Sequence, residues 1–363
     1  MVINYNDKMI TSQTETVRLF QSDIPEELAA VMKAASHCRD KHVERKVFLR
    51  GLIEISNHCN CNCLYCGIRR GNQKIQRYRL DDAQIVSTAL HCFQLGFHSI
   101  CLQAGEDKDD NKIKRIADTV QAIRKKSKTM DPEKQGLGIT LSLGELRYEQ
   151  YQLLREAGAH RYLLRMETSN PDLFQSIHPP AQRFETRLEC LHMLKELGYM
   201  MGTGVMIGLP GQTAEDLWND LMFFKELNVD MLGMGPYIPH ADTPLARSSR
   251  PMLLDPFAAA LKMIALARLS MPDINIVAST ALQTLYPDAL EQGLNAGANV
   301  VMPIMTPQPV RSYYQLYINK QERPPSETID RIAAAGYTPG LCEWGDAPHY
   351  VKRARSEGLG VRR

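Results

Sequence analysis

Short apolar runs alternate with amphipathic stretches along most of the chain. Helical spacing of apolar residues is clear in residues 80–96, where one face would hold Leu80, Ile85, Leu90 and Phe93. Eight runs are rich in branched and apolar residues and have the length of buried strands; they cover residues 46–56, 98–105, 137–144, 160–167, 200–210, 229–238, 274–280 and 298–304. This alternation predicts parallel strands joined by right-handed crossover helices.

Eight such units predict an α/β fold, a closed (β/α)8 barrel of the TIM type. We expect residues 1–45 to form an N-terminal helical cap, in which the helical stretch 24–40 covers the bottom of the barrel. Residues 46–305 would form the barrel, and residues 306–363 a C-terminal extension that packs on it. A doubly wound open sheet is the alternative, and it would bind ligands at a switch point of the sheet instead of in a ring of loops.

The composition of the chain limits the kinds of molecule that it is expected to bind. The chain has 363 residues, 44% of them hydrophobic, which is enough apolar material for a large core. Its net charge of +2 gives no general attraction to nucleic acid or lipid. No apolar run approaches the roughly 20 residues needed to cross a bilayer, and the first 20 residues lack the apolar core of a signal peptide. We therefore expect a cytoplasmic protein with neither a nucleic-acid nor a membrane partner.

Candidate chemistry lies directly after the first predicted strand. His58 precedes four cysteines, Cys59, Cys61, Cys63 and Cys66, which fall within eight residues. In a barrel, function sits at the C-terminal ends of the strands, which is where this loop would lie. The chain has nine cysteines, and an odd number with four packed together favours metal binding or redox chemistry over structural disulfides.

The spacing of these cysteines favours an iron–sulfur cluster. Cys59, Cys63 and Cys66 have the form C-x3-C-x2-C and supply three thiolates. A 4Fe–4S cluster normally takes four cysteines, so one iron would stay open for a small molecule. Structural zinc sites need four ligands, usually as two separated pairs, and no second pair follows. A cramped zinc site including His58, or a set of free thiols, remains an alternative.

The segment HCNCNCLYCGIRRGN resembles the signature loop of the radical S-adenosylmethionine (SAM) superfamily. In this superfamily three cysteines hold a 4Fe–4S cluster, and the amino and carboxylate groups of SAM chelate the fourth iron. The resemblance implies that Cys59, Cys63 and Cys66 are the ligands and that Tyr65 is the aromatic residue which the family places before the last cysteine. It makes Cys61 a bystander, expected to face solvent.

A more specific resemblance covers about residues 45–318. The segments LQAGEDKDD, ITLSLGE, YLLRMETSNPDLF, GVMIGLPGQT, GPYIPHADTPLA and GANVVMPIMTP are similar to those of the HydE family of FeFe-hydrogenase maturases, whose relatives are biotin synthase and methylornithine synthase. The resemblance implies an enzyme that reductively cleaves SAM to a 5′-deoxyadenosyl radical, which acts on a small substrate in the barrel during H-cluster maturation.

Expected partners are an electron donor such as flavodoxin or ferredoxin, and other hydrogenase maturases. Three alternatives stay open: a paralogue acting on another small sulfur-containing amino acid, a mutase like methylornithine synthase, and a non-enzymatic zinc protein.

The resemblance also assigns site residues. Glu167 and Arg187 suit the two charged poles of SAM, although an ion pair between them is an alternative. Met206 is expected beside the adenine. The full expected SAM-binding set is Tyr65, Gln103, Ala104, Gly105, Ser142, Glu167, Arg187 and Met206. A cation inside a barrel must be paired or bind an anion, and small hydroxyls offer hydrogen bonds without filling space. The expected substrate set is Arg50, Thr140, Arg165, Ser279 and Thr280.

Two features depart from the HydE pattern. Many HydE proteins carry a further cysteine set near the C-terminus for an auxiliary cluster, whereas this region offers only Cys342. We therefore expect one cluster per chain, which also weakens the similarity to biotin synthase, an enzyme with an extra iron–sulfur centre as sulfur donor. HydE proteins often have histidine where this chain has Met166. That difference favours the alternative of a different substrate.

Overall fold

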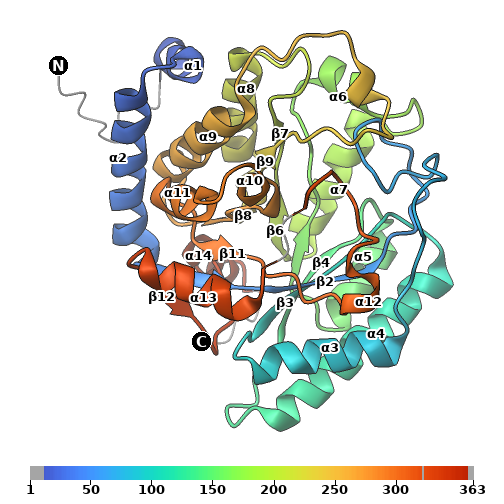
Figure 1. Cartoon of the computed structure of the whole chain (residues 1–363). Helices are drawn as coiled ribbons and strands as arrows, with labels where there is room; N and C mark the ends of the chain where they lie inside the picture. The colour runs from blue at the N-terminus through green and yellow to red at the C-terminus, as the bar shows by residue number, and fades with distance from the viewer. Residues whose placement is uncertain (1–11, 321–322, 359–363) are drawn as a thin grey trace.

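Eight parallel strands close into a barrel in the computed structural model, which describes residues 12–320 and 323–358 (Figure 1). The sheet has the order β10-β8-β6-β5-β4-β3-β2. Closure comes from the pairing of β1 with β11 and from a bridge between Val277 and Val300. The barrel strands are β1 (Lys46–Leu49) and β2 (Gly51–Ser56), which together form the first strand, then β3 (Ser99–Ala104), β4 (Gly138–Ser142), β5 (Arg161–Leu163), β6 (Met200–Thr203), β8 (Met231–Leu232), β10 (Asn275–Ile276) and β11 (Val300–Val301). The predicted TIM-type barrel is confirmed, and the open doubly wound sheet is wrong.

Helices surround the barrel because alternate strand residues point outward and are apolar. Ile53, Ile100 and Leu141 are fully buried against them. The crossover helices begin at clear signals; α3, for example, starts with a reciprocal capping box between Asp81 and Gln84. They are α3 (Asp82–Gln94), α4 (Asp110–Met130), α5 (Tyr148–Glu156), α6 (Pro171–Ile177), α7 (Phe184–Glu196), α8 (Ala214–Glu226), α9 (Pro256–Ser270), α10 (Thr280–Leu285) and α11 (Ala289–Asn295).

Two short elements extend the strands beyond the main sheet. After β6 and β8 the chain continues into β7 (Met206–Ile207) and β9 (Gly235–Pro236), which pair in parallel with each other. A single 3-10 turn, η2 (Leu245–Arg247), follows in the loop that leads to α9.

The N-terminal helices lie along the side of the barrel. Helix α2 (Pro25–Val43) packs on α9 and α11, and α1 (Gln13–Gln21) packs on α8 (Figure 1). Val31 and Ala35 are fully buried in these contacts. The expectation that residues 24–40 cap the bottom of the barrel is therefore wrong.

Residues near the C-terminus close the bottom instead. The chain passes through α12 (Gln308–Arg311) and α13 (Pro325–Ala334), and then β12 (Thr338–Gly340) pairs in parallel with β1, ahead of α14 (Pro348–Ser356). Arg161 at the start of β5 donates to Asp346 Oδ1 at 2.8 Å and to the Trp344 carbonyl at 2.6 Å. Arg50 donates to the Gly345 carbonyl at 3.1 Å. One C-terminal loop thus accepts hydrogen bonds from two buried cations of the barrel, although Arg50 Nε has no hydrogen-bond partner among the described residues.

A histidine joins this buried network in its neutral form. His160 Nε2 lies 3.1 Å from Asp346 Oδ1, and its ring packs on Trp344 with centroids 4.6 Å apart. Burial, reinforced by the neighbouring Arg161, lowers the pKa of His160 to about 4. Burial alone would raise the pKa of Asp346, but Arg161 beside it outweighs this and holds that pKa well below its ordinary value.

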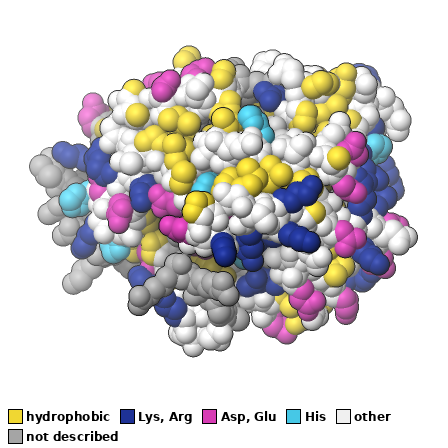
Figure 2. Space-filling view, turned by 90° about the horizontal axis from the view of Figure 1, so that it is seen from below, with side chains coloured by type: hydrophobic (Ala, Val, Ile, Leu, Met, Phe, Trp, Pro, Cys, Tyr) yellow, Lys and Arg dark blue, Asp and Glu magenta, His cyan; other side chains and the backbone are white. Residues whose placement is uncertain are grey.

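On the face seen in Figure 2, lysine, arginine, aspartate and glutamate side chains are interspersed with hydrophobic ones. Within residues 12–320 and 323–358, no helix is both long enough and apolar enough to cross a membrane.

We predict that the free energy of unfolding falls as the pH is lowered from 7 to 5. Unfolded histidine binds a proton below about pH 6.5, whereas folded His160 stays neutral down to about pH 4, so acid favours the unfolded chain. The expected contribution of His160 is about 2 kcal/mol over this interval, measured by urea unfolding at each pH. The Asp346 contribution is present above its unfolded pKa and is lost only at lower pH, because its folded pKa is depressed.

The control is His160→Gln, which keeps a donor for Asp346 and does not titrate. Between pH 7 and 5 the unfolding free energy of this variant should fall by about 2 kcal/mol less than that of the wild type. Equal pH dependence of the two proteins would contradict the neutral buried histidine.

Candidate functional site

A cavity of about 220 Å³ lies at the C-terminal mouth of the barrel. Strand ends, the cysteine loop and residues 314–317 of the C-terminal segment line it. The cavity brings together most of the residues expected from the sequence: Cys59, Cys63, Tyr65, Cys66, Gln103, Ala104, Gly105, Ser142, Arg165, Glu167, Arg187 and Met206. These residues are far apart in the sequence, and they meet because parallel strands all end at the same rim.

One arginine organises the cysteine loop, which has no regular secondary structure of its own between β2 and Arg79. Arg77 donates to four backbone carbonyls, those of Asn57 (2.6 Å), Ile68 (2.8 Å), Arg69 (2.7 Å) and Asn72 (3.1 Å). A guanidinium group has five donors in a fixed planar fork, so a single side chain can hold both ends of the loop. The loop backbone is therefore fixed from behind while its thiols face the cavity.

Two glycines allow the loop to pack closely on its neighbours. A Cβ on Gly105, at the end of β3, would lie 2.4 Å from the His58 carbonyl and 2.5 Å from Cys59 Cβ. A Cβ on Gly67 would lie 2.0 Å from the Gln315 carbonyl. Glycine at these two positions lets β3 support the loop from below and the C-terminal segment cover it from above.

Burial keeps the deeper thiols of the loop protonated. Cys63 donates to Gln182 Oε1 at 3.0 Å. Burial raises the pKa of Cys63 to about 12 and that of Cys66 well above its ordinary value. A hydrogen bond from the Cys61 thiol lowers the pKa of Cys59 to about 7. Thiols release their protons when a metal binds them.

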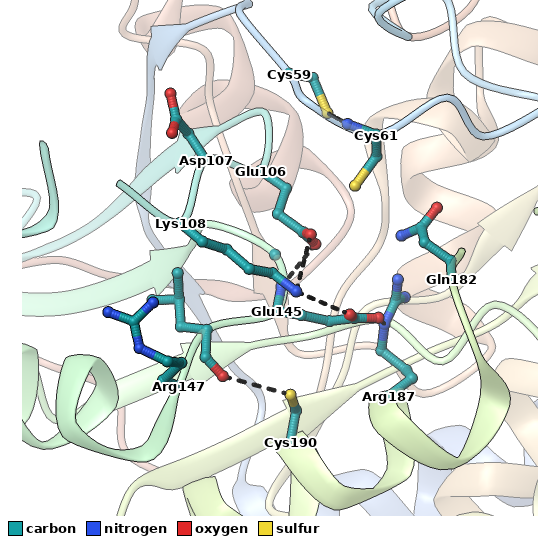
Figure 3. Close-up of polar contacts among 12 residues, drawn as sticks. Cys59, Cys61, Glu106, Asp107, Lys108, Glu145, Arg147, Gln182, Arg187 and Cys190 are labelled. Carbon is teal, nitrogen blue, oxygen red and sulfur yellow. Dashed lines mark hydrogen bonds and ion pairs between the residues drawn. The ribbon is translucent and has the colours of Figure 1, made fainter. Parts of the chain in front are cut away.

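Cys61 does not have the solvent-facing position expected for it. It lines the same cavity as the other three cysteines, and its thiol points inward, on the side of Glu106 (Figure 3). The expectation that this thiol faces solvent is wrong. The choice of Cys59, Cys63 and Cys66 as ligands still rests on the resemblance and stays a prediction.

The cysteine loop and its cavity offer donors for a cluster and for a small ligand. Within the described ranges, no three histidine, cysteine, aspartate or glutamate side chains converge on one point that could hold a metal ion. Ligands of a 4Fe–4S cluster need no such convergence, because each thiolate binds a different iron. Buried thiols along one cavity wall, together with orphaned polar atoms, fit a cluster and a small zwitterionic ligand.

Those orphaned atoms belong to Glu167 and Arg165. Glu167 has a left-handed backbone (φ 71°), which is unusual for a residue with a side chain. Its backbone N–H donates to the Gly204 carbonyl at 3.0 Å. Glu167 Oε2 lies 3.0 Å from Arg165 Nη2, without hydrogen-bond alignment, and both Oε2 and Arg165 Nε are buried without a hydrogen-bond partner. Strain held at a cavity wall next to unpaired polar atoms is typical of a ligand site.

Arg187 has a partner other than the one considered from the sequence. Its Nε donates to Glu145 Oε1 at 2.7 Å and its Nη1 to the Arg165 carbonyl at 2.6 Å. Burial would lower its pKa, but Glu145 outweighs this and raises the pKa of Arg187. Lys108 links the same carboxylate, at 3.3 Å, to Glu106 (Figure 3). The alternative of a Glu167–Arg187 ion pair is therefore wrong.

Four expected substrate residues do not line the cavity. Arg50 lies at the opposite end of the barrel, in the network with Gly345, which argues against a substrate role. Thr140 is buried deeper in β4, with an unpartnered Oγ1. Ser279 caps α10, accepting from the Leu282 N–H at 3.3 Å. Thr280 lines a separate small pocket.

Sequence reasoning missed several lining residues that come from loops. Gln182 contacts Cys63, and Tyr237 lines the wall with a buried, unpartnered hydroxyl. Tyr314 and Tyr317 come from the segment YYQLY, whose aromatic density was the one available signal.

The ring of Tyr65 is held by a histidine that the sequence did not single out. Tyr65 Oη lies 3.3 Å from His178 Nε2, and His178 Nδ1 lies 2.9 Å from the Phe174 carbonyl. Burial lowers the pKa of His178 to about 3, so its neutral ring donates to that carbonyl and accepts from the tyrosine.

Met166, one of the two departures from the HydE pattern, does not contact the cavity. Its side chain is fully buried in the core and is not among the lining residues. A histidine at this position would therefore be enclosed by the core in this structure. The substitution gives no direct evidence for a different substrate.

Comparisons with known proteins agree with this geometry. Residues 53–224 match the radical SAM superfamily, and residues 236–338 match the Biotin and Thiamin Synthesis associated domain. The chain is 48% identical to the FeFe-hydrogenase maturase subunit HydE of Thermotoga maritima over 80% of this chain and 79% of that protein. It is 29% identical to 3-methylornithine synthase of Methanosarcina acetivorans over 88% of each chain. The crystal structure of methylornithine synthase (PylB) superposes with a TM-score of 0.78 at 26% identity, covering 91% of this chain and 94% of that one.

We predict that alanine at Cys59, Cys63 or Cys66 abolishes cluster assembly, because two thiolates cannot hold a cubane. The measurement is iron and sulfide content after anaerobic reconstitution. Cys61→Ala is the matched control from the same loop and should keep about four irons per chain. Iron loss from Cys61→Ala as complete as from the others would contradict the ligand assignment.

We predict that Glu167→Gln weakens SAM affinity at least about tenfold (about 1.4 kcal/mol), because a neutral amide attracts an ammonium group less than a carboxylate does. Isothermal titration of the cluster-loaded protein gives the affinity, with iron content as the check on assembly. The matched control is Glu149→Gln on the exposed face of α5, which should bind SAM normally. If the Glu167→Gln variant binds SAM with unchanged affinity, Glu167 has a structural role and does not bind SAM.

Proposed function

The chain belongs to the radical SAM superfamily and, within it, to the HydE family of FeFe-hydrogenase maturases; on that premise we propose that it acts in hydrogenase cofactor assembly, on a small anionic substrate bound in the barrel. The observation that carries this proposal is the 48% identity to HydE over about four fifths of both chains. The family implies a 4Fe–4S cluster and SAM.

We propose that Cys59, Cys63 and Cys66 hold the cluster. When bound, the cluster supplies the electron that cleaves the C–S bond of SAM. Arg77 keeps the thiols in position through the loop backbone, and Gly105 lets the loop lie directly on β3. Both are positioning residues, since Arg77 does not line the cavity and Gly105 has no side chain.

Glu167 and Arg187 suit the charged ends of SAM. Oε2 of Glu167 pairs with Arg165 at 3.0 Å but accepts no hydrogen bond among the described residues, so it would accept one from an ammonium group, and its strained backbone keeps it at the rim. Arg187 is anchored through Nε and Nη1, which leaves its Nη2 donors for a carboxylate. Because Glu145 keeps Arg187 charged despite burial, the cation is present before the ligand arrives.

The substrate subsite is the part of the cavity near Arg165. Its Nε has no hydrogen-bond partner and is buried, so an anionic group is the ligand that would satisfy it. Tyr237, Tyr314 and Tyr317 wall the same space and exclude water. Exclusion of water and of quenching groups is what a reactive radical requires of its cavity.

Three finer points belong to the proposal. We propose one cluster per chain, because residues 306–363 contain only Cys342 and that residue is exposed. The electron comes from a carrier protein such as flavodoxin or ferredoxin. The working compartment is the cytoplasm, in keeping with nine cysteines of which none forms a disulfide among the described residues.

A second candidate is a mutase of the methylornithine synthase type, or a HydE paralogue acting on another small sulfur-containing amino acid. The mutase is supported by the superposition with methylornithine synthase, which covers 94% of that chain. An amino-acid substrate would also satisfy Arg165 through its carboxylate. The lower identity, 26% against 48%, favours the maturase.

We predict that the chain restores hydrogenase activity in a host that expresses an FeFe-hydrogenase and the other maturases but lacks HydE. The measurement is hydrogen evolution in anaerobic extracts, with the Cys63→Ala variant as the negative control.

SAM cleavage with dithionite but no restored hydrogenase would contradict the maturase role and favour an amino-acid substrate. Formation of methylornithine from candidate amino acids would then be tested. One zinc per chain and no SAM cleavage would contradict the radical enzyme altogether.

A further inference from the structure

The cysteine loop carries an unusual concentration of positive charge. Residues 55–80 contain five cations, Arg69, Arg70, Lys74, Arg77 and Arg79, and no aspartate or glutamate. The whole chain has a net charge of only +2. The excess therefore belongs to this segment and not to the general composition.

Much of this charge faces solvent, on the outer side of the loop. The Lys74 side chain is 73% exposed and the Arg79 side chain 38% exposed. Arg70 is exposed, and among the described residues its guanidinium has no ion-pair partner. Lys74 pairs with Asp242 at 2.5 Å, whereas Arg79 approaches Asp107 only to 4.0 Å. Of the three exposed cations of this segment, Arg70 and Arg79 are therefore the two without a close carboxylate partner among the described residues.

The same loop carries both the thiols and solvent-exposed residues. His58 and Asn60 are exposed, and Cys59 and Cys61 between and beside them are half-buried, while the four thiols line the cavity on the inner side. Arg70 lies against this stretch, because its backbone N–H donates to the Cys61 carbonyl at 2.8 Å. The positive surface and the thiol wall are therefore the two sides of a single layer of chain.

We propose that the outer face of residues 58–79 is the docking surface for an acidic one-electron carrier protein; this inference rests on the proposed function, because reductive cleavage of SAM needs one electron from outside the site. Among the described residues, no second cluster of cysteines lies between this loop and solvent to relay the electron. A carrier seated on Arg70 and Arg79 would contact the segment that carries the thiols, because the Arg70 backbone bonds to the Cys61 carbonyl.

Charge complementarity sets the chemistry of the partner. A basic surface attracts acidic carriers, raises their association rate by about 10- to 1,000-fold at low salt and loses this advantage as salt screens it. The carrier gives up one electron and returns to its oxidised form. The C–S bond of SAM takes up that electron, and methionine and a 5′-deoxyadenosyl fragment are the products.

The test compares two electron sources in the same protein. The variant is Arg70→Glu combined with Arg79→Glu, and the rate of 5′-deoxyadenosine formation is measured anaerobically with reduced flavodoxin, with reduced ferredoxin and with dithionite. We expect the carrier-driven rate to fall at least about tenfold at low salt, while the dithionite-driven rate keeps its wild-type value. The wild-type rate with the preferred carrier should fall with added salt, and the rate with dithionite should not.

The matched control is Lys125→Glu combined with Lys126→Glu, which changes the net charge equally. These exposed residues lie near the end of α4 and so at the far end of the barrel from the cysteine loop (Figure 1). This control should keep the wild-type rate of 5′-deoxyadenosine formation both with the carrier protein and with dithionite. A control that loses the carrier-driven rate as much as the Arg70/Arg79 variant would show that overall charge matters and not this surface.

Binding of the oxidised carriers is measured in parallel, without SAM, so that a variant with incomplete cluster still gives an answer. Weaker binding of flavodoxin to the variant supports a flavin carrier, and weaker binding of ferredoxin supports an iron–sulfur carrier. Wild-type affinity of the variant for both carriers, or a wild-type rate with both, overturns the docking surface. Failure of the wild-type protein to cleave SAM even with dithionite would instead overturn the proposed function.

Discussion

The loop that follows the first barrel strand must be held without a helix or sheet of its own. It is held by contacts to its backbone: four carbonyls accept from Arg77, the end of β3 supports it where Gly105 has no side chain, and the Leu316 carbonyl accepts from the Gly67 N–H at 2.9 Å. Because these contacts use backbone atoms, the cysteine side chains stay available to the cavity. The positions of the thiols, the wall of the cavity and the outer basic surface all depend on this fixed loop.

The charge distribution at the mouth of the barrel depends on two arginines that have different hydrogen-bond partners. Arg187 is anchored by Glu145 and the Arg165 carbonyl, and it acts as a fixed cation beside the thiols. Arg165 forms an ion pair with Glu167 at 3.0 Å and donates to the Val205 carbonyl at 2.9 Å, while Arg165 Nε and Glu167 Oε2 make no hydrogen bond among the described residues. A site in which every polar atom is hydrogen-bonded would leave no atom for a ligand to bind. Here Arg187 is a fixed cation, whereas the Arg165–Glu167 pair keeps polar atoms without hydrogen bonds. That asymmetry distinguishes it from the closed network of Arg161 and Asp346 at the bottom of the barrel.

Sequence patterns predicted the eight strands well because buried parallel strands are continuous apolar runs. The rim residues Gln103, Ser142 and Glu167 were expected from the family resemblance, and all three line the cavity. The sequence patterns failed where the structure is determined by contacts between segments that lie far apart in the sequence. The burial of Arg50 depends on a carbonyl 295 residues away, and no local pattern indicates that the C-terminal loop, and not α2, closes the bottom. Gln182 and Tyr317 were missed because loop residues carry no periodicity, whereas Tyr237 lies in the predicted strand run 229–238, where the pattern did not indicate that its side chain lines the cavity. Met166 was given weight because it departs from the HydE pattern, whereas its side chain is buried in the core and does not line the cavity.

The central claim is that three thiolates at the mouth leave one iron open to SAM. Mössbauer spectroscopy of the ⁵⁷Fe-reconstituted protein, with and without SAM, tests it most directly. The account predicts a 4Fe–4S spectrum in which one iron of four changes its parameters when SAM is added. A spectrum that SAM leaves unchanged, or four equivalent sites each with a protein thiolate, would contradict it.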